Sequence, residues 1–285
     1  MNSVKTILTH PGGAHKDDFL ACCLLLATSP APIVRRDPTE GELDDPSFCV
    51  VDIGGRHEPH LMNFDHHQLP RDHKPTCSVS LVLQWLGVYN DAKRFCEWLE
   101  PTEWFDCRGP VKTADWLGVD REVLNKLNSP IDVTVLRRFA YSEFLGPGDI
   151  IWELMKMIGE DLLNYIRSLR ERLEYLMTSC EIWEIDAVSK IVVLPKAEHM
   201  PSEPSLGMGR FVEMNNLCDQ VIALVYPDRR GDGYALSRYN DCSKLDFSRL
   251  ECEGDVLFCH TQGFLAKTST TSHRRLIELI HLASV

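Results

Sequence analysis

The sequence of 285 residues carries a formal net charge of −12 and 44% hydrophobic residues. A chain of this length can bury a large core, and two domains are the usual expectation. The acidic balance argues against broad electrostatic attraction to nucleic acid or to an anionic membrane, while a local nucleic-acid site stays open. The longest apolar run, residues 19–27, is much shorter than the roughly 20 apolar residues of a membrane span. We therefore expect no membrane partner.

The eleven cysteines are spread along the chain and are never spaced as Cys-x-x-Cys. This spacing argues against a structural zinc ribbon or a thioredoxin-like site. Most lie among apolar residues, where a free thiol packs as a small hydrophobic side chain. The N-terminus resembles a targeting peptide poorly, because a single lysine is soon followed by Asp17 and Asp18. We expect a reducing, cytoplasmic location.

The first elements alternate between strand and helix. Residues 5–9 predict a short buried strand that ends at His10, and a Pro-Gly-Gly turn follows. A helix is predicted over 19–27, with Asp17 and Asp18 at its positive N-terminal end.

Two further strands are predicted over 33–36 and 48–53. The second is uniformly apolar up to Asp52, as in a strand buried on both faces. Strands that alternate with helices predict a parallel α/β sheet. Ligands of such sheets bind at the carboxyl ends of the strands. His10 and Asp52 both lie at predicted strand ends, and residues 65–67 follow shortly afterwards.

The rest of the chain divides into a helical part and a second part with strands. Helical periodicity covers 80–100 and most of 120–180. Strands are predicted at 191–194, 221–226, 234–239 and 256–260, before a closing helix at 274–283. We therefore predict an α/β protein with a parallel-sheet N-terminal domain (1–130), a helical connector (131–180) and a smaller α+β C-terminal domain (181–285).

Three segments of the first quarter of the chain place imidazoles and carboxylates beside turns. They are the stretch from His10 to Asp18, the strand end at Asp52, and Asp65-His66-His67. Such groups bind Mn, Fe or Zn more strongly than Mg in mixed nitrogen and oxygen sites. Bound divalent cations would also offset several of the carboxylates. The sequence therefore predicts a metal centre at the ends of several strands.

The same segments resemble successive motifs of the DHH phosphoesterase superfamily. The matching residues are His10-x4-His15-x-Asp17, Val51-Asp52-Ile53-Gly54-Gly55 and Phe64-Asp65-His66-His67-Gln68. The resemblance is closest to the melanocyte-proliferating-gene branch, a family of metal-dependent RNA exonucleases. It is specific over residues 1–70 and loose over 110–250.

The resemblance implies a role for each motif residue. His10 and His15 are similar to ligands of one metal ion, and Asp17 and His66 are similar to ligands of a second. Asp52 would bridge the two ions. Two such ions can activate a bridging water and neutralise charge on a phosphoryl oxygen, so no Ser, Cys or Lys nucleophile is required.

Further roles are implied for neighbouring residues. Asp65 would orient a metal ligand from behind, as metal-bound histidines commonly require, and His67 would face the scissile phosphate. Asp18 stands where the branch usually has glutamate and is not an expected ligand. The superfamily supplies a further aspartate after a helix, and we expect Asp106 to be this metal ligand. Its competitors in the sequence are Glu103, Asp115 and Asp120.

Near the C-terminus, residues 258–264 resemble the histidine-containing glycine turn of the branch. His260 and Gly263 are therefore predicted to bind substrate, with an ordinary turn as the alternative. Arg238, on a predicted strand, is a further candidate phosphate contact. Residues 265–267 replace a second glycine pair of the branch, and backbone approach to a phosphate favours glycine. Substrate binding at this turn can therefore differ from that of the branch.

Three hypotheses for function follow. The first is a phosphodiesterase with two divalent cations, expected to be Mn with Mg, Co or Zn as alternatives, that shortens RNA or oligonucleotides from one end. The second keeps the metals but takes a small phosphorylated molecule, such as a nucleotide, a cyclic dinucleotide or pyrophosphate. The third is a non-catalytic relative, against which the mutual repulsion of clustered carboxylates argues. The expected partner is single-stranded RNA or an oligonucleotide, and a homodimer stays open.

Overall fold

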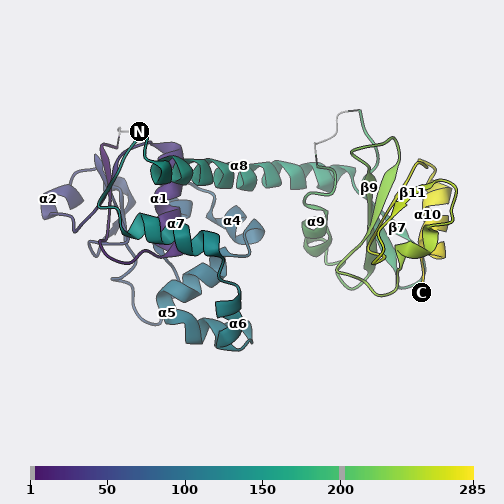
Figure 1. The fold of residues 1–285 in the computed structure, drawn as a ribbon, viewed down its shortest axis with the longest axis horizontal. Coiled ribbons are helices and arrows are strands. Elements are labelled where there is room, and N and C mark those ends of the chain that lie inside the picture. The colour runs from purple at the N-terminus through teal and green to yellow at the C-terminus, as the bar shows by residue number, and fades with distance from the viewer. Residues whose placement is uncertain (1–3, 199–202) are drawn as a thin grey trace. The chain divides into compact units, whose positions relative to one another are not determined.

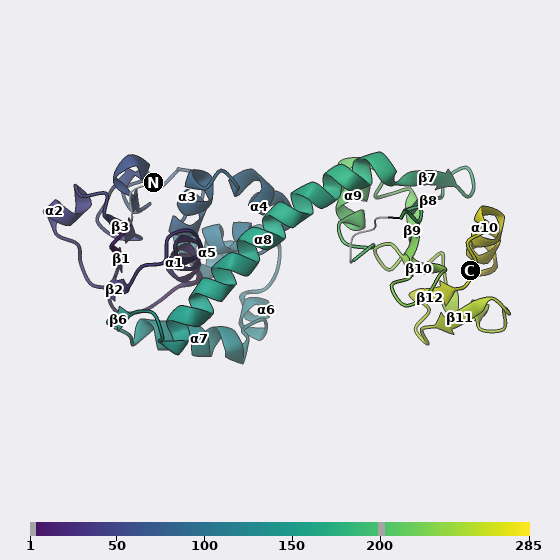
Figure 2. The ribbon, with the colours of Figure 1, turned by 90° about the horizontal axis from the view of Figure 1, so that it is seen from above.

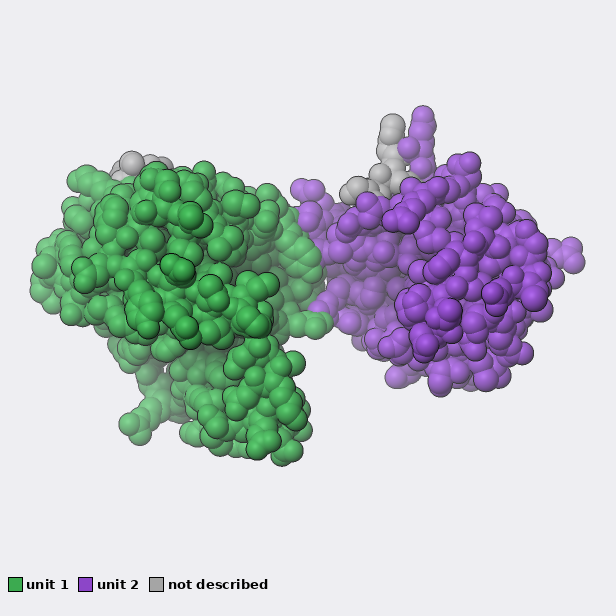
Figure 3. All heavy atoms as spheres, in the orientation of Figure 1, with its two compact units in different colours: residues 1–167 green, residues 168–285 purple. Residues whose placement is uncertain are grey.

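The computed structural model describes residues 4–198 and 203–285. The chain forms two compact units, Met1–Arg167 (unit 1) and Ser168–Val285 (unit 2), coloured separately in Figure 3. Each unit contains a six-stranded sheet (Figure 1). The predicted α/β fold class is confirmed.

The sheet of unit 1 has the order β4-β5-β3-β1-β2-β6. Its four central strands are parallel: β1 (Thr6–Thr9), β2 (Ile33–Arg35), β3 (Phe48–Val51) and β5 (Asn63–Phe64). The antiparallel edge strands are β4 (His57–Glu58) and β6 (Phe144–Leu145). The predicted first three strands are therefore present, and β3 ends at Val51, one residue before Asp52.

Helix α1 (Lys16–Thr28) is buried on nearly every side, which explains its continuous apolar run. It packs closely against α3 (Ser78–Trp85), and Figure 2 shows it beside the row of β6, β2, β1 and β3. Helix α8 (Ile150–Ser179) crosses α1 at a glycine. A Cβ atom at Gly159 would lie 1.9 Å from the Cys23 carbonyl oxygen, so only glycine allows this close approach.

The remaining helices of unit 1 are α2 (Glu40–Leu43), α4 (Tyr89–Phe95), α5 (Leu99–Leu117), α6 (Arg121–Lys126) and α7 (Pro130–Ala140), and a 3-10 turn covers Pro59–Leu61. Helix α5 is kinked at Gly109, where φ is +76° and Pro110 follows. Proline lacks the amide proton of a helical hydrogen bond, so the first half of α5 ends there as a separate segment. That first half carries Asp106.

The sheet of unit 2 has the order β11-β12-β10-β9-β8-β7. Its strands are β7 (Glu181–Glu184), β8 (Lys190–Val193), β9 (Val221–Pro227), β10 (Tyr234–Arg238), β11 (Val256–Cys259) and β12 (Leu265–Thr268). The described residues of unit 2 also contain the end of α8, helices α9 (Met208–Met214) and α10 (His273–Leu282), and a 3-10 turn (Phe247–Leu250). Leu276, Leu279 and Ile280 of α10 enter the same core as Leu236 and Phe247.

The predicted domain limits 1–130, 131–180 and 181–285 stay predictions. Within the predicted connector, β6 pairs with β2 of the first sheet, and α8 runs through the division between the units at residue 167. Among the described residues, none of the helices has both the length and the apolar character needed to cross a bilayer.

Candidate metal centre

The carboxyl ends of three parallel strands place the predicted motif residues on one edge of the sheet of unit 1. His10 follows β1, Asp52 follows β3, and the Asp65-His66-His67 segment follows β5. Asp52 has a φ of +59°, a left-handed conformation that aspartate tolerates better than most residues. This backbone turn lets the Asp52 carboxylate stand beside a pocket of about 570 Å³. The pocket lining comprises His10, His15, Asp52, Ile53, Gly54, Gly55, Asp65, His67 and Asp106.

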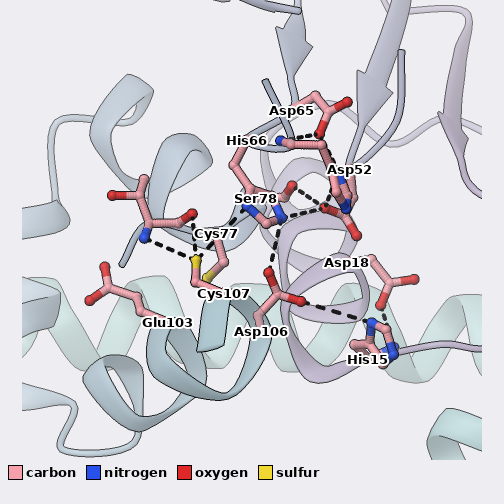
Figure 4. Close-up of polar contacts among 12 residues, drawn as sticks. His15, Asp18, Asp52, Asp65, His66, Cys77, Ser78, Glu103, Asp106 and Cys107 are labelled. Atoms are coloured by element: carbon pink, nitrogen blue, oxygen red, sulfur yellow. Dashed lines mark hydrogen bonds and ion pairs between the residues drawn. The ribbon is translucent and has the colours of Figure 1, made fainter. Parts of the chain in front are cut away.

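His66 stands between two carboxylates. Its Nε2 atom lies 3.0 Å from Asp52 Oδ1 and 2.9 Å from Asp106 Oδ2 (Figure 4). His66 Nε2 and Asp106 Oδ2 are both buried, yet neither has a partner with hydrogen-bond geometry. Imidazole and carboxylate ligand atoms that converge in this way fit a shared cation.

The position of Asp106 separates it from its competitors. Helix α5 brings Asp106 to His66, whereas Asp115 and Asp120 are exposed. Glu103 is buried, but Ser80 and Tyr89 each donate a hydrogen bond of 2.7 Å to its Oε1 atom. Among the four acidic candidates, only Asp106 therefore lines the pocket.

The Asp17 carboxylate is the least satisfied group of the site. It is 1% exposed, and both of its oxygens are buried without a hydrogen-bond partner. His15, Asp17 and Asp106 place one ligand atom each within 4.8 Å of one another. Burial, and then the negative charges of Asp52 and Asp106, raise the pKa of Asp17 well above its usual value. A positive charge placed beside this carboxylate, such as a bound cation, would stabilise its ionised form.

The His10 imidazole has a neighbour that the sequence analysis did not select. Its Nε2 atom lies 3.3 Å from Asp18 Oδ2 and 3.5 Å from Asp52 Oδ2. Asp18 is fully buried, accepts the His15 amide proton at 2.7 Å, and lies 3.7 Å from the Arg35 guanidinium. Arg35 also donates to the carbonyl oxygens of His10 and Gly13. Asp18 and Arg35 therefore fix the loop that carries the first two histidines.

One sequence signal could have revealed Arg35. Arginine is rarely buried without a specific partner, and Arg35 lies on the apolar strand β2. The residue is 4% exposed, and its guanidinium points toward the site loop, away from solvent.

Asp65 contacts His67, whereas His66 meets Asp52 and Asp106 instead. The Asp65 Oδ1 atom accepts the His67 amide proton at 3.1 Å and contacts His67 Nδ1 at 2.7 Å, while Oδ2 accepts the Gly55 amide proton at 2.6 Å. Although burial raises the pKa of Asp65, the bonds from His67 and Gly55 hold it below its usual value. The structure thus shows Asp65 orienting the exposed His67 ring.

Behind His66 and Asp52 lie two residues that the sequence analysis missed. Ser78 donates a 2.8 Å hydrogen bond to Asp52 Oδ1, and Cys107 Sγ lies 3.9 Å from His66 Nδ1. Serine at the start of a helix and cysteine after an aspartate are common patterns, so neither carried a distinctive signal.

The residues present fit divalent cations. Imidazole nitrogens and carboxylate oxygens are the donors that Mn, Fe and Zn bind. The oxygens of Asp17, His66 Nε2 and Asp106 Oδ2 are buried without a hydrogen-bond partner, and a cation would satisfy them. The six predicted ligands, His10, His15, Asp17, Asp52, His66 and Asp106, all lie in unit 1. Their individual assignment as ligands stays a prediction.

The predicted substrate-binding residues lie in unit 2. Arg238 donates to the Leu245 carbonyl oxygen at 3.4 Å and has a buried Nε without a partner. The His260 ring packs against Phe264, with ring centroids 3.9 Å apart and the ring planes tilted by 33°. Gly263 has a φ of +66°, and a Cβ atom there would lie 2.0 Å from Asp246 Oδ1. The glycine is therefore required by the turn, and substrate binding by these residues stays a prediction.

Unit 1 thus defines a class of protein: an α/β protein with a candidate divalent-metal centre at the carboxyl ends of parallel strands. Residues 6–83 match the MYG1 exonuclease family model, described as "Uncharacterised protein family (UPF0160)". This region, which contains five of the six predicted ligands, therefore carries the sequence signature of that family. The resemblance inferred from the motifs is confirmed over these residues.

The curated relatives match a similarly short part of the chain. The MYG1 exonuclease of Rattus norvegicus is 45% identical over 64 residues, which is 21% of this chain and 16% of the relative. The MYG1 exonuclease of Bos taurus is 44% identical over 64 residues, with the same coverage. The similarity therefore spans about a sixth of the length of these relatives.

Two solved structures are similar to the chain as a whole. One is a DHH domain from a member of a family of ribosomal proteins, with a TM-score of 0.34, 13% identity, and coverage of 97% of this chain and 85% of that chain. The other is a pGpG-specific phosphodiesterase, PggH, from Vibrio cholerae, with a TM-score of 0.32, 13% identity, and coverage of 98% and 100%. Both TM-scores are below 0.5, so neither similarity carries an argument.

Proposed function

We propose that this chain is a metal-dependent phosphodiesterase that acts as an exonuclease on RNA or short oligonucleotides. The observation that carries the proposal is the buried Asp17 carboxylate, which has no partner and stands among His15, Asp52 and Asp106 beside an open pocket. The family signature over residues 6–83 supports the same chemistry. Free cysteines throughout the chain support a cytoplasmic location.

Bound divalent cations would lower the pKa of a bound water and neutralise charge on a phosphoryl oxygen. The two oxygens of Asp52 face different parts of the ligand set, Oδ1 toward His66 and Oδ2 toward His10. This placement supports Asp52 as the bridging ligand. Ser78 holds the Asp52 carboxylate in place through its hydroxyl.

His67 is the residue placed to touch substrate. Its ring is 63% exposed and lines the pocket, while Nδ1 is held by Asp65. With Nδ1 held by Asp65, Nε2 is the ring nitrogen left to contact a phosphate oxygen in the pocket. The scissile phosphate would therefore lie between His67 and the metal ligands.

Incubation of the purified chain with Mn²⁺ and end-labelled single-stranded RNA tests the proposal. We expect a ladder of products that shortens from one end. Hydrolysis of dinucleotides or pyrophosphate alone would replace the exonuclease with a phosphohydrolase of small molecules, which the net charge of −12 favours. Absence of bound metal in elemental analysis, together with no hydrolysis of any phosphoester, would leave a non-catalytic binding protein.

A further inference from the structure

A second pocket, of about 200 Å³, shares a wall with the candidate metal centre. His67 and Asp106 line both pockets, so the two are neighbours on the surface of unit 1. The lining of the second pocket comprises His66, His67, Leu69, Pro70, Arg71, His73, Lys74, Thr76, Asp106, Cys107 and Arg108. The residues 69–76 form the loop between the DHH segment and α3.

The charge of this pocket is opposite to that of the chain. Arg71, Lys74 and Arg108 contribute three positive charges, and Asp106 is the one carboxylate of the lining. Among the described residues, no carboxylate lies within 4.0 Å of any of these three cations, although Asp72 neighbours Arg71 in sequence. Three cations without a carboxylate partner, on a chain of net charge −12, indicate a place where a negatively charged ligand binds.

The ammonium of Lys74 has a further positive neighbour. Lys93 of α4, and then partial burial, lower the pKa of Lys74, while Glu103 and Glu100 act in the opposite direction. Lys93 is itself 3.5 Å from Glu100. An anion bound in the pocket would therefore stabilise the Lys74 ammonium, which lines it.

The loop is held in place before any ligand binds. Arg108 donates to the His73 carbonyl oxygen at 2.5 Å, which ties the loop to α5. Cys107 Sγ contacts the Thr76 carbonyl oxygen at 3.2 Å and the Thr76 amide nitrogen at 3.3 Å. Within the loop, the Lys74 carbonyl oxygen accepts from Thr76 Oγ1 at 3.0 Å. A prearranged loop loses little entropy when it binds a ligand.

From this arrangement we infer that the second pocket binds a non-scissile phosphate of the substrate, one nucleotide away from the phosphate at the metal centre. The inference rests on the proposed function and narrows its substrate class to chains with at least two phosphates. Arginine side chains suit this role because the guanidinium binds two phosphate oxygens at once. The phosphate can be the terminal group of a dinucleotide or an internal group of a longer strand.

A binding experiment tests the inference without catalysis. The probes are a dinucleotide whose internal linkage is a charged, non-hydrolysable methylene phosphonate, with and without a 5′-terminal phosphate. Fluorescence anisotropy measures the binding of each to the full chain in Mn²⁺. We expect the terminal phosphate to tighten binding about tenfold, as charge-assisted hydrogen bonds typically do. A trinucleotide analogue has two internal linkages and no terminal phosphate. Its binding shows whether an internal phosphate can occupy the second pocket in place of a terminal one.

Arg71→Gln and Lys74→Gln should each reduce the preference for the phosphorylated probe several-fold, and the double variant should remove it. Each should also lower the slope of log K against log salt by about one. Within the described part of the chain Arg71 makes no hydrogen bond or ion pair, so its loss does not threaten the fold. Arg121→Gln, an exposed arginine of α6 outside both pockets, is the matched control and should change neither probe.

Equal binding of the unphosphorylated dinucleotide, the phosphorylated dinucleotide and the trinucleotide analogue by the wild-type chain would overturn the inference. If Arg71→Gln weakened the binding of every probe by the same factor, the inference would also be overturned. A subsite for a second phosphate must affect only the probes that carry one. Failure of the proposed function has a different signature: the natural dinucleotide stays intact in Mn²⁺ while the preference for a second phosphate persists.

Discussion

At the scale of single residues, substitution of Asp17 should affect stability differently without and with bound metal. Asp17→Asn removes a buried acidic group whose ionised form three neighbouring carboxylates disfavour, so we expect the metal-free protein to become more stable. The same variant should lose the stabilisation by Mn²⁺. Thermal denaturation with EDTA and with Mn²⁺ measures both effects. A variant that melts lower in EDTA and still responds fully to Mn²⁺ would contradict the assignment of Asp17 as a ligand.

Substitutions of Asp52 and of its neighbour Ser78 should reduce hydrolytic activity to different degrees. Asp52→Asn should abolish hydrolysis while the fold stays intact, because its two oxygens face both His10 and His66. Ser78→Ala removes only the hydrogen bond to Asp52, so we expect a loss of about 10–100-fold, as for other partners of metal ligands. Asp37→Asn, at an exposed carboxylate, is the control. Steady-state rates and circular dichroism check the series, and full activity in Asp52→Asn would exclude a bridging role.

The affinity for Mn²⁺ should rise with pH. In the metal-free protein, the bond to Asp18 raises the pKa of His10 to about 9. Burial lowers the pKa of His66, but Asp106 and Asp52 outweigh it and raise that pKa to about 12. Both rings therefore hold protons at neutral pH, and a metal binds only the unprotonated nitrogen.

The sign follows from the raised pKa of His10. Its protonation contributes stability that is fully present below pH 6.5 and is lost as the pH rises through 9, so metal-free unit 1 weakens while metal binding strengthens. For each proton released, the Mn²⁺ affinity should increase about tenfold per pH unit between pH 6.5 and 9. Calorimetric titrations in buffers of different ionisation enthalpy count the protons. An affinity independent of pH would mean that His10 and His66 are not ligands.

At the scale of elements, the contact between α8 and α1 should reverse the usual effect of alanine in a helix. Gly159→Ala places a Cβ atom against the Cys23 carbonyl oxygen, so we expect a loss of about 1–3 kcal/mol in stability, as for other overpacked interiors. Gly41→Ala in α2 meets no atom within 4 Å and should be neutral or stabilising by up to about 1 kcal/mol. Chemical denaturation compares the two variants, and a stabilised Gly159→Ala would show that the helices can separate at low cost.

The kink in α5 matters for the site as well as for the fold. Gly109 and Pro110 end its first half shortly after Asp106, Cys107 and Arg108. That half supplies a candidate metal ligand, a contact to His66 and a cation of the second pocket. One short helical segment therefore joins the metal centre to the proposed phosphate subsite.

At the scale of the whole molecule, the two units are separately compact and should unfold in separate steps. All six predicted ligands lie in unit 1. Mn²⁺ at about 100 times Kd should therefore increase the free energy of unfolding of that unit alone, by about 2.7 kcal/mol. Leu236→Ala, in the core of unit 2, should lower the free energy of unfolding of unit 2 by roughly 2–5 kcal/mol. Differential scanning calorimetry of the full chain resolves both. An equal response of both transitions to Mn²⁺ would place metal ligands outside unit 1.

Local sequence patterns were sufficient to predict β1 and β3, two of the three strands that carry the site, whereas the two-residue strand β5 before Asp65 was not predicted. Strands 33–36 and 48–53 could be predicted because apolar, β-branched runs bounded by turns form buried strands whatever surrounds them. The parallel pairing of β1 and β3 then brings His10 and Asp52 together without further information. The ordered spacing of the histidines and aspartates indicated the metal chemistry.

The contacts between individual groups, in contrast, became known from the three-dimensional packing alone. That packing selected Asp106 over Asp115 and Asp120, joined Asp65 to His67, and revealed Asp18 and Arg35 behind His10. The cationic pocket likewise joins a loop and a helix, with Arg108 and His73 being 35 positions apart. These contacts depend on how distant segments pack, and local sequence periodicity carries no information about which distant side chains meet.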